Sequence, residues 1–282
     1  MLISSIYNMK ELNKLNGLID GALLNYKDYS LIYDDLDLDL AYSFCLNNNI
    51  IPIISLNKMF YPFEIDNVKD IYLKYNNALF LITDIGLYNI GKKLNIENKL
   101  IYNPETMLTN YYDLKIYKDL GFNALAMSLE IPISDVIESK NKTNADIFYL
   151  VFGKRMMFYS RRKLLSLYKE KANLDFKNNK MYLKEEKRED YFPIIENENG
   201  TKIFRSYIIN YLDKLDEMNF KYYLLDSFDI NFNIYKKVVI IYNDYLKKII
   251  SKEDALNKIN KLNLNILDGF KYQDSIYQKE EF

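Results

Sequence analysis

The residues that could carry chemistry in this 282-residue chain belong to few types, because it contains no histidine and a single cysteine, Cys45. The absence of histidine excludes a Ser-His-Asp triad, a Cys-His dyad and a histidine-ligated zinc site. A single cysteine excludes an intrachain disulfide and a four-cysteine iron–sulfur cluster held by this chain alone. Any chemistry must therefore use carboxylates, Lys, Arg, Tyr, Ser or a bound cofactor.

The segment from residue 154 to residue 163 combines cations with aromatic rings. Three of the chain's five arginines lie in it, Arg155, Arg161 and Arg162, together with Tyr159 and Ser160. Guanidinium groups bind phosphate through paired hydrogen bonds, and aromatic rings stack on unpaired bases. The segment therefore predicts a site for RNA or a small anion. A solvated basic loop that pairs with nearby acids is the alternative.

Polar residues that close or follow apolar runs are the candidates for acid–base chemistry. They are Asn57, Asp84, Glu130 and Asp226, of which Glu130 and Asp226 are the catalytic candidates. Two such carboxylates could act as acid and base if they lie close together. Asp84 could instead cap the following helix. Cys45 lies in an apolar helical pattern, which predicts a buried small residue rather than a nucleophile.

Eight short apolar runs alternate with helical patterns, which predicts an α/β fold. Each run is almost continuously apolar, as expected for a parallel strand buried on both faces. Eight strand–helix units in about 250 residues are typical of a (β/α)8 TIM barrel. A doubly wound open sheet is the alternative. The predicted strands cover residues 2–6, 22–26, 50–57, 78–84, 99–103, 124–128, 146–153 and 222–228, and the predicted helices cover 9–16, 36–47, 67–76, 87–94, 111–120, 134–140, 206–219, 231–249 and 252–262.

About fifty residues interrupt this alternation after the seventh strand. Residues 154–205 are charged, and parts of them alternate between polar and apolar side chains. We expect an insertion of β-hairpin character at the C-terminal end of strand seven, the barrel face on which binding sites lie. No low-complexity linker divides the chain, so we expect residues 1–282 to form a single domain.

The overall composition limits the partners and the location of the protein. The net charge is −1 and the isoelectric point is about 5.8, so no global basic field attracts nucleic acid. The first ten residues do not resemble a secretory signal. The longest apolar runs are far shorter than the roughly 18 residues of a membrane span. We therefore expect no membrane partner and a cytoplasmic location.

Several blocks along nearly the whole chain resemble peptidase family U32, the collagenase-like family. Residues 121–130 (GFNALAMSLE) resemble the family stretch that ends in "REL", which places Glu130 on the family glutamate. Residues 159–166 (YSRRKLLS) resemble "YSGRCLLS", and Asp226 falls on the acid of "KIEG". The family pattern "R…YPI…GT" is matched by Arg188 together with residues 191–194 and 200–201.

The departures from the family pattern concern histidine and cysteine. The family histidine is replaced by Phe152, and two family cysteines are replaced by Met156 and Lys163. The family's cysteine-rich block has no counterpart between residues 168 and 186. In members that have this block, the cysteines are associated with an iron–sulfur cluster. The resemblance therefore implies that this chain binds no such cluster and no other cofactor.

A shorter, cysteine-free branch of the family is more similar still, including its tail, residues 268–272 (DGFKY). The branch is linked to hydroxylation of the wobble uridine of tRNA beside a longer, cysteine-bearing paralogue. The resemblance thus implies tRNA and such a paralogue as partners. A collagenase-like peptidase and a non-catalytic scaffold for a larger U32 protein are the alternatives. The residues implied to contact RNA or a small anion are Arg155, Tyr159, Ser160, Arg162 and Arg188.

Overall fold

The computed structural model describes residues 1–175, 180–187 and 189–272, and it confirms the predicted barrel. Parallel pairing runs from strand to strand in the order β7-β13-β1-β2-β3-β4-β5-β6. A parallel bridge between Leu125 of β6 and Ile147, just before β7, closes the ring. The strands are β1 (Leu2–Ile6), β2 (Gly21–Leu24), β3 (Ile51–Leu56), β4 (Leu79–Ile82), β5 (Leu100–Tyr102), β6 (Ala124–Leu125), β7 (Phe148–Gly153) and β13 (Tyr222–Leu225).

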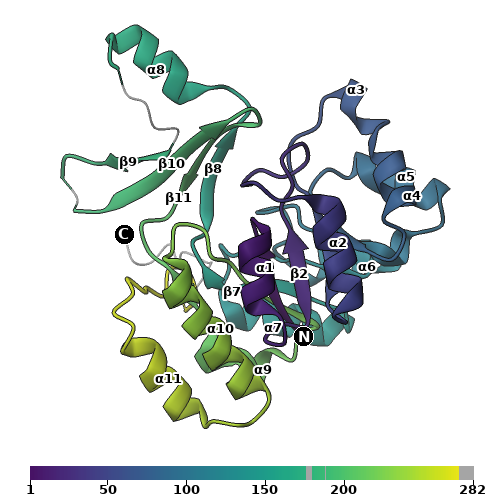
Figure 1. The fold of residues 1–282 in the computed structure, drawn as a ribbon. Coiled ribbons are helices and arrows are strands. Elements are labelled where there is room, and N and C mark those ends of the chain that lie inside the picture. The colour runs from purple at the N-terminus through teal and green to yellow at the C-terminus, as the bar shows by residue number, and fades with distance from the viewer. Residues whose placement is uncertain (176–179, 188, 273–282) are drawn as a thin grey trace, which may run out of the picture.

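Helices cover the outside of the barrel (Figure 1). Several begin at a side chain that accepts a backbone N–H of the first turn, which satisfies a donor that the helix leaves free. Asn8, Asp37, Asn110, Asn231 and Ser251 act in this way. The helices are α1 (Met9–Leu15), α2 (Leu38–Asn47), α3 (Pro62–Ile65), α4 (Val68–Lys74), α5 (Gly86–Lys93), α6 (Tyr111–Asp119), α7 (Ile133–Thr143), α10 (Phe232–Leu246) and α11 (Lys252–Asn260), with a 3-10 turn η1 (Glu97–Lys99).

Two separate apolar layers follow from the alternation of side chains along each strand. The outer layer fills the space between the strands and the helices, and it includes Cys45, which is fully buried as predicted. The inner layer fills the barrel and has members from every strand. Its members are Ile3, Leu23, Ile53, Leu81, Ile101, Ala124, Phe148, Tyr222 and Leu224.

The β-rich insertion expected after the seventh strand is also confirmed. It forms an antiparallel sheet in the order β8-β11-β10-β9, and Figure 1 shows this sheet beside the barrel with a helix, α8, at its far end. Gly200 makes its turn possible, because its φ is +102° and an added Cβ would lie 2.1 Å from the Ser160 carbonyl oxygen. The elements are β8 (Met156–Ser160), α8 (Leu164–Ala172), β9 (Lys180–Lys184), β10 (Tyr191–Asn197) and β11 (Gly200–Phe204).

The prediction of one helix over residues 206–219 is wrong. The segment contains a two-residue strand, β12 (Ile209–Asn210), a 3-10 turn, η2 (Leu212–Lys214), and a short helix, α9 (Leu215–Met218). The reason lies in β6, which is only two residues long and meets β7 only at its beginning. The free edge near the end of β7 is therefore paired by β12, which runs antiparallel to Phe152 and Gly153.

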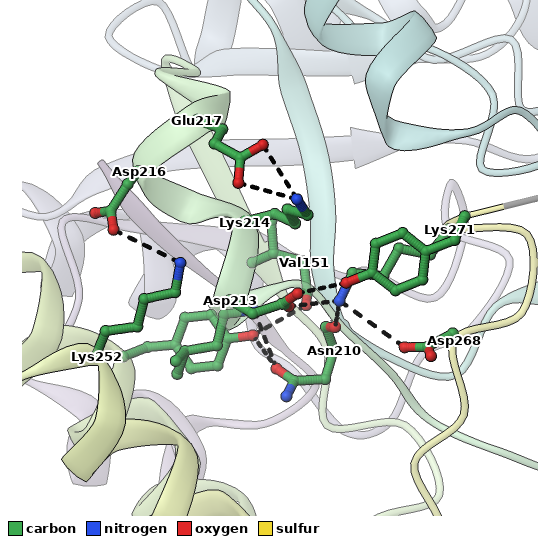
Figure 2. A network of polar contacts seen from close by, with 12 residues as sticks. Val151, Asn210, Asp213, Lys214, Asp216, Glu217, Lys252, Asp268 and Lys271 are labelled. Atoms are coloured by element: carbon green, nitrogen blue, oxygen red, sulfur yellow. Dashed lines mark hydrogen bonds and ion pairs between the residues drawn. The ribbon is translucent and has the colours of Figure 1, made fainter.

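The last described residues return to the barrel and are held by a polar network (Figure 2). Lys271 is 3% exposed, and its Nζ donates to the Asp213 carboxylate and to the Asn210 carbonyl oxygen at 2.9 Å. The Tyr272 hydroxyl donates to the other Asp213 oxygen at 2.6 Å. Residues 270–272, called here the C-terminal strap, are thus tied to the barrel through Lys271 and Tyr272. Among the residues that the structure describes, no helix is both long and apolar enough to cross a bilayer.

Candidate functional site

A cavity of about 440 Å³ lies at the C-terminal mouth of the barrel. Apolar residues of the inner layer, such as Leu81 and Leu224, contribute to its lining, and Met156 and Phe204 of the insertion sheet line it from the other side. Parallel strands all end at this face, so the residues that follow them converge there. One polar side chain after each of the eight strands lines the cavity: Tyr7, Asn25, Asn57, Thr83, Asn103, Glu130, Arg155 and Asp226.

Arg155 is the buried cation among these eight polar side chains, with 6% of its surface exposed. Its Nη2 donates to the Glu130 carboxylate and its Nη1 to the Leu129 carbonyl oxygen at 3.2 Å. The guanidinium also lies 5.2 Å from the centre of the Phe270 ring, which is part of the C-terminal strap. Burial, and then the nearby Arg205, lower the pKa of Arg155. Arg155 is thus a paired and sterically fixed cation.

Asp226 and Tyr7 form the second polar pair. The Tyr7 hydroxyl donates to Asp226 Oδ1 at 2.8 Å, and the Phe228 amide donates to the same oxygen at 2.8 Å. Burial raises the pKa of Asp226, although these hydrogen bonds act in the opposite direction. Gly153 permits the close approach, because an added Cβ there would lie 2.9 Å from the Asp226 Cβ.

Glu105 is a third carboxyl group in the cavity wall. Its backbone is left-handed, with φ at +59°, which is unusual for a glutamate and places the side chain beside Asn103. The Asn103 amide nitrogen donates to Glu105 Oε1 at 3.3 Å. Burial raises the pKa of Glu105 to about 7, despite opposing effects of Arg155 and Asn103. A carboxyl group with this pKa can donate or accept a proton near neutral pH.

Two neutral donors of residues in the cavity wall have no hydrogen-bond partner in the described part of the chain. The buried Thr83 hydroxyl has no hydrogen-bond partner in the described part of the chain. The Asn57 side-chain oxygen accepts the Leu31 amide at 2.8 Å, which leaves its Nδ2 without a partner among the described residues. An unpaired buried hydroxyl costs free energy, so a ligand that pairs with it gains affinity.

The structure brings four of the predicted site residues to this cavity, Glu130, Arg155, Tyr159 and Asp226. It does not bring Ser160 or Arg162 there. Ser160 accepts the backbone N–H of Arg162 at 3.2 Å in the exposed turn after β8, and Arg162 is exposed. Arg188 lies outside the described residues. Asp84 accepts the amide of Gly86, the first residue of α5, at 2.7 Å, so its side chain pairs with the start of the following helix although Ile85 holds the N-cap position.

Sequence reasoning missed Tyr7, Asn25, Thr83 and Asn103. Each is the first residue after a strand of the barrel, directly after Ile6, Leu24, Ile82 and Tyr102. Glu105 carried no such signal, because its role depends on a left-handed turn and on burial. Applied to the predicted strands, the rule that the first residue after a strand faces the mouth finds only Tyr7, because the predicted strands 22–26, 78–84 and 99–103 include the other three residues.

The residues present do not fit a cysteine-ligated iron–sulfur cluster. Met156 lines the cavity where the family motif has a cysteine, and Lys163 is an exposed residue after β8. Cys45 is buried within α2, and burial raises the pKa of its thiol to about 12. Within residues 1–175, 180–187 and 189–272, no group of three or more His, Cys, Asp or Glu side chains is arranged to hold a metal ion.

Comparison with known proteins gives one family and several more distant similarities. The model of peptidase family U32 matches residues 34–276. The tRNA hydroxylation protein P2 of Bacillus subtilis (strain 168) is 30% identical over 126 residues, which are 43% of this chain and 41% of that protein. This chain therefore aligns with less than half of that relative's length.

Two solved structures are similar at low identity. The U32 peptidase Mk0906 has a TM-score of 0.46 at 7% identity, over 56% of this chain and 70% of that one. Orotidine 5'-monophosphate decarboxylase from Methanocaldococcus jannaschii has a TM-score of 0.45 at 13% identity, over 93% of this chain and 98% of that one.

Proposed function

Because the chain belongs to peptidase family U32, we propose that it binds a uracil base of tRNA at the barrel mouth and acts in wobble-uridine hydroxylation. The relative that matches 43% of the chain is a tRNA hydroxylation protein, which supports the choice of RNA as substrate. In this proposal the chain holds no cluster and works with a cysteine-bearing paralogue. The redox chemistry belongs to that partner, and this chain binds and orients the base.

The observation that carries the proposal is that the cations of the cavity are already paired while its unpaired donors are neutral. Arg155 pairs with Glu130, and Lys154 pairs with Asp229 at 2.6 Å. The free groups are the Thr83 hydroxyl and the Asn57 amide. Carbonyl oxygens and an N–H of a uracil edge are complementary to these groups, whereas a phosphate would require an unpaired cation. The volume of about 440 Å³ is typical of small-ligand pockets.

The acids at the mouth are suited to orient a base and to exchange protons with it. Asp226 is held by Tyr7 and the Phe228 amide, so its free lone pairs are directionally fixed. Glu105, whose pKa is raised to about 7, can supply or accept a proton near neutral pH.

Deletion of the gene tests the proposal. We expect loss of hydroxylated wobble uridine in tRNA measured by mass spectrometry, and restoration by the wild-type gene. The sharpest variant is Thr83→Val, which removes the unpaired hydroxyl and keeps the side-chain shape. It should reduce the hydroxylated fraction without lowering the melting temperature, because no internal hydrogen bond is lost.

The matched control is Glu138→Gln, which alters a surface carboxylate of α7 that pairs with Lys142. It should restore hydroxylation as fully as the wild type. Unchanged hydroxylation after deletion of the gene would disprove the proposed function. Full restoration of hydroxylation by the Thr83→Val variant would disprove the role of the cavity in the proposed function.

The peptidase activity implied by the family name is tested separately. The purified protein is incubated with gelatin, and cleavage that Asp226→Asn abolishes would favour a peptidase over the proposed function. Because the chain contains no histidine, such an activity would have to rest on carboxylates, a lysine or a bound group.

A further inference from the structure

A second cavity of about 470 Å³ adjoins the first, on the outer side of the barrel mouth. We propose that Tyr61, Phe63 and Arg161, called here the aromatic platform, bind an unpaired nucleobase of an RNA strand and its phosphate. This platform would hold the nucleotide next to the base that enters the barrel. The inference rests on the proposed function for the identity of the RNA, but its geometry is independent of the first cavity's chemistry.

The stacking geometry of the platform is the first support. The rings of Tyr61 and Phe63 are nearly parallel, at 12°, with centres 5.4 Å apart. The Arg161 guanidinium lies 3.4 Å from the centre of the Tyr61 ring. Despite this packing, Phe63 is 74% exposed and Tyr61 is 43% exposed. An exposed aromatic surface next to a guanidinium is the arrangement that binds unpaired bases in a sequence-tolerant way.

The charges around the platform are the second support. Arg161 has no hydrogen bond or ion pair with another described residue, so its N–H donors are free for a phosphate. Lys27 is the other accessible cation, because its side chain is 61% exposed and its contact with Glu198 is long, at 3.8 Å. Lys58, by contrast, is buried and pairs with Glu64 at 2.8 Å, so it forms part of the cavity wall and is not free to bind a phosphate. Arg162 and Lys163 extend the exposed basic surface beyond Arg161.

The wall that the two cavities share is the third support. Tyr159 and Met59 line both of them, and the Met59 amide donates to the Tyr159 hydroxyl at 3.3 Å. One wall thus separates a cavity with neutral donors from a platform with exposed rings and a free guanidinium. A strand that places one base inside the barrel has its adjacent nucleotide at this wall. Arg155 and Arg161, close in sequence, therefore differ in role, because Arg155 is paired with Glu130 in the first cavity and Arg161 lies at the platform.

Fluorescence anisotropy with the purified full chain and a labelled RNA stem-loop of seven loop nucleotides tests the platform. Phe63→Ala should weaken binding by about 5- to 150-fold, the effect of losing one base–aromatic stack. Phe63→Tyr keeps the ring and should retain the affinity. The matched control is Tyr112→Ala, because Tyr112 is 67% exposed on α6 and lines neither cavity. Melting temperatures verify that each variant is folded.

Stem-loops with one abasic loop position each give the decisive measurement. At one position, removal of the base should weaken binding to the wild type but not to Phe63→Ala, because both changes remove the same stack. Equal effects of every abasic position on both proteins would overturn the platform. An unchanged affinity of Phe63→Ala, or no binding by the wild type, would overturn it as well.

The platform and the proposed function can fail separately. If Phe63→Ala loses affinity while gene deletion leaves wobble-uridine hydroxylation unchanged, the platform stands and the proposed function fails. If deletion abolishes hydroxylation and Phe63→Ala both binds RNA and restores hydroxylation fully, the proposed function stands and the platform fails.

Discussion

At the scale of single residues, Glu105 shows how burial can bring the pKa of a glutamate close to neutral pH. The pKa of Glu105 is raised from 4.5 to about 7, so the folded chain retains a proton that the unfolded chain releases between these pH values. The free energy of unfolding therefore falls as the pH rises from about 4.5 to about 7, and this contribution is constant above that range.

We expect Glu105→Gln to remove this part of the pH dependence. As the pH rises from 4.5 to 8, the free energy of unfolding of the variant should increase by about 1 to 3 kcal/mol relative to that of the wild type, because the neutral amide has no charge to desolvate. Urea denaturation followed by circular dichroism at several pH values measures the difference. Asp226 contributes a slope of the same sign, so only the difference between the two proteins is informative. Parallel pH profiles would contradict the prediction, and Glu138→Gln serves as the control.

At the scale of elements, the C-terminal strap links the end of the chain to the site. Lys271 and Asp213 bind each other within the network of Figure 2, and the preceding residue, Phe270, packs against Arg155 and Arg205. The Lys271 side chain is 4% exposed, so its charge depends on the Asp213 partner. The strap thus contacts the barrel mouth through the Phe270 ring, which packs against the Arg155 guanidinium.

We expect Asp213→Ala to destabilise the protein by about 2 to 4 kcal/mol, because the buried Lys271 charge loses its near partner and keeps only the exposed Asp268 carboxylate at 3.9 Å. The matched control lies in the same figure. Lys252 and Asp216 are 3.9 Å apart with exposed side chains, so Lys252→Ala should cost less than about 1 kcal/mol. Denaturant unfolding measures the loss of unfolding free energy in both variants. Equal losses would contradict the expected difference between the buried and the exposed ion pair.

At the scale of the whole molecule, Asp229 connects the insertion sheet to the barrel. Its carboxylate accepts from Lys154 after β7 at 2.6 Å, from Lys180 of β9 at 2.6 Å and from the Tyr182 hydroxyl at 2.7 Å. Burial acts to raise the pKa of Asp229, but these three contacts hold it below its usual value. Asp229 thus joins the segment after β13 to two parts of the insertion.

We expect Asp229→Asn to loosen the insertion sheet more than the barrel. Asparagine keeps the side-chain shape and tolerates the left-handed backbone, with φ at +57°, but it leaves Lys154, whose side chain is 11% exposed, without a counter-charge. Hydrogen exchange should accelerate in β9 and β10 while the barrel strands remain protected. Uniform acceleration across both sheets, or none, would contradict this role.

The strand pattern of the barrel could be predicted because each strand is buried on both faces. β1 has the predicted bounds, and the other barrel strands lie within a few residues of theirs. Residues 206–219 could not be predicted, since their short strand forms only because β6 leaves an edge of β7 open. The predicted site residues do not all lie together. Glu130, Arg155, Tyr159 and Asp226 line one cavity, whereas Ser160 ends β8 and Arg162 lies in the exposed turn that follows it.

The sequence by itself determined the barrel, the insertion after strand seven, the family and the exclusion of histidine and multi-cysteine chemistry. These features depend on residue type and on local periodicity, both of which can be read directly from the order of residues in the chain. Only the tertiary structure decided which charges are paired, which donors are free and where the two cavities meet. Arg155 is neutralised by Glu130 from another loop, and Arg161 stacks on Tyr61 one hundred residues away. Pairing of this kind depends on distances in space, which sequence order does not encode.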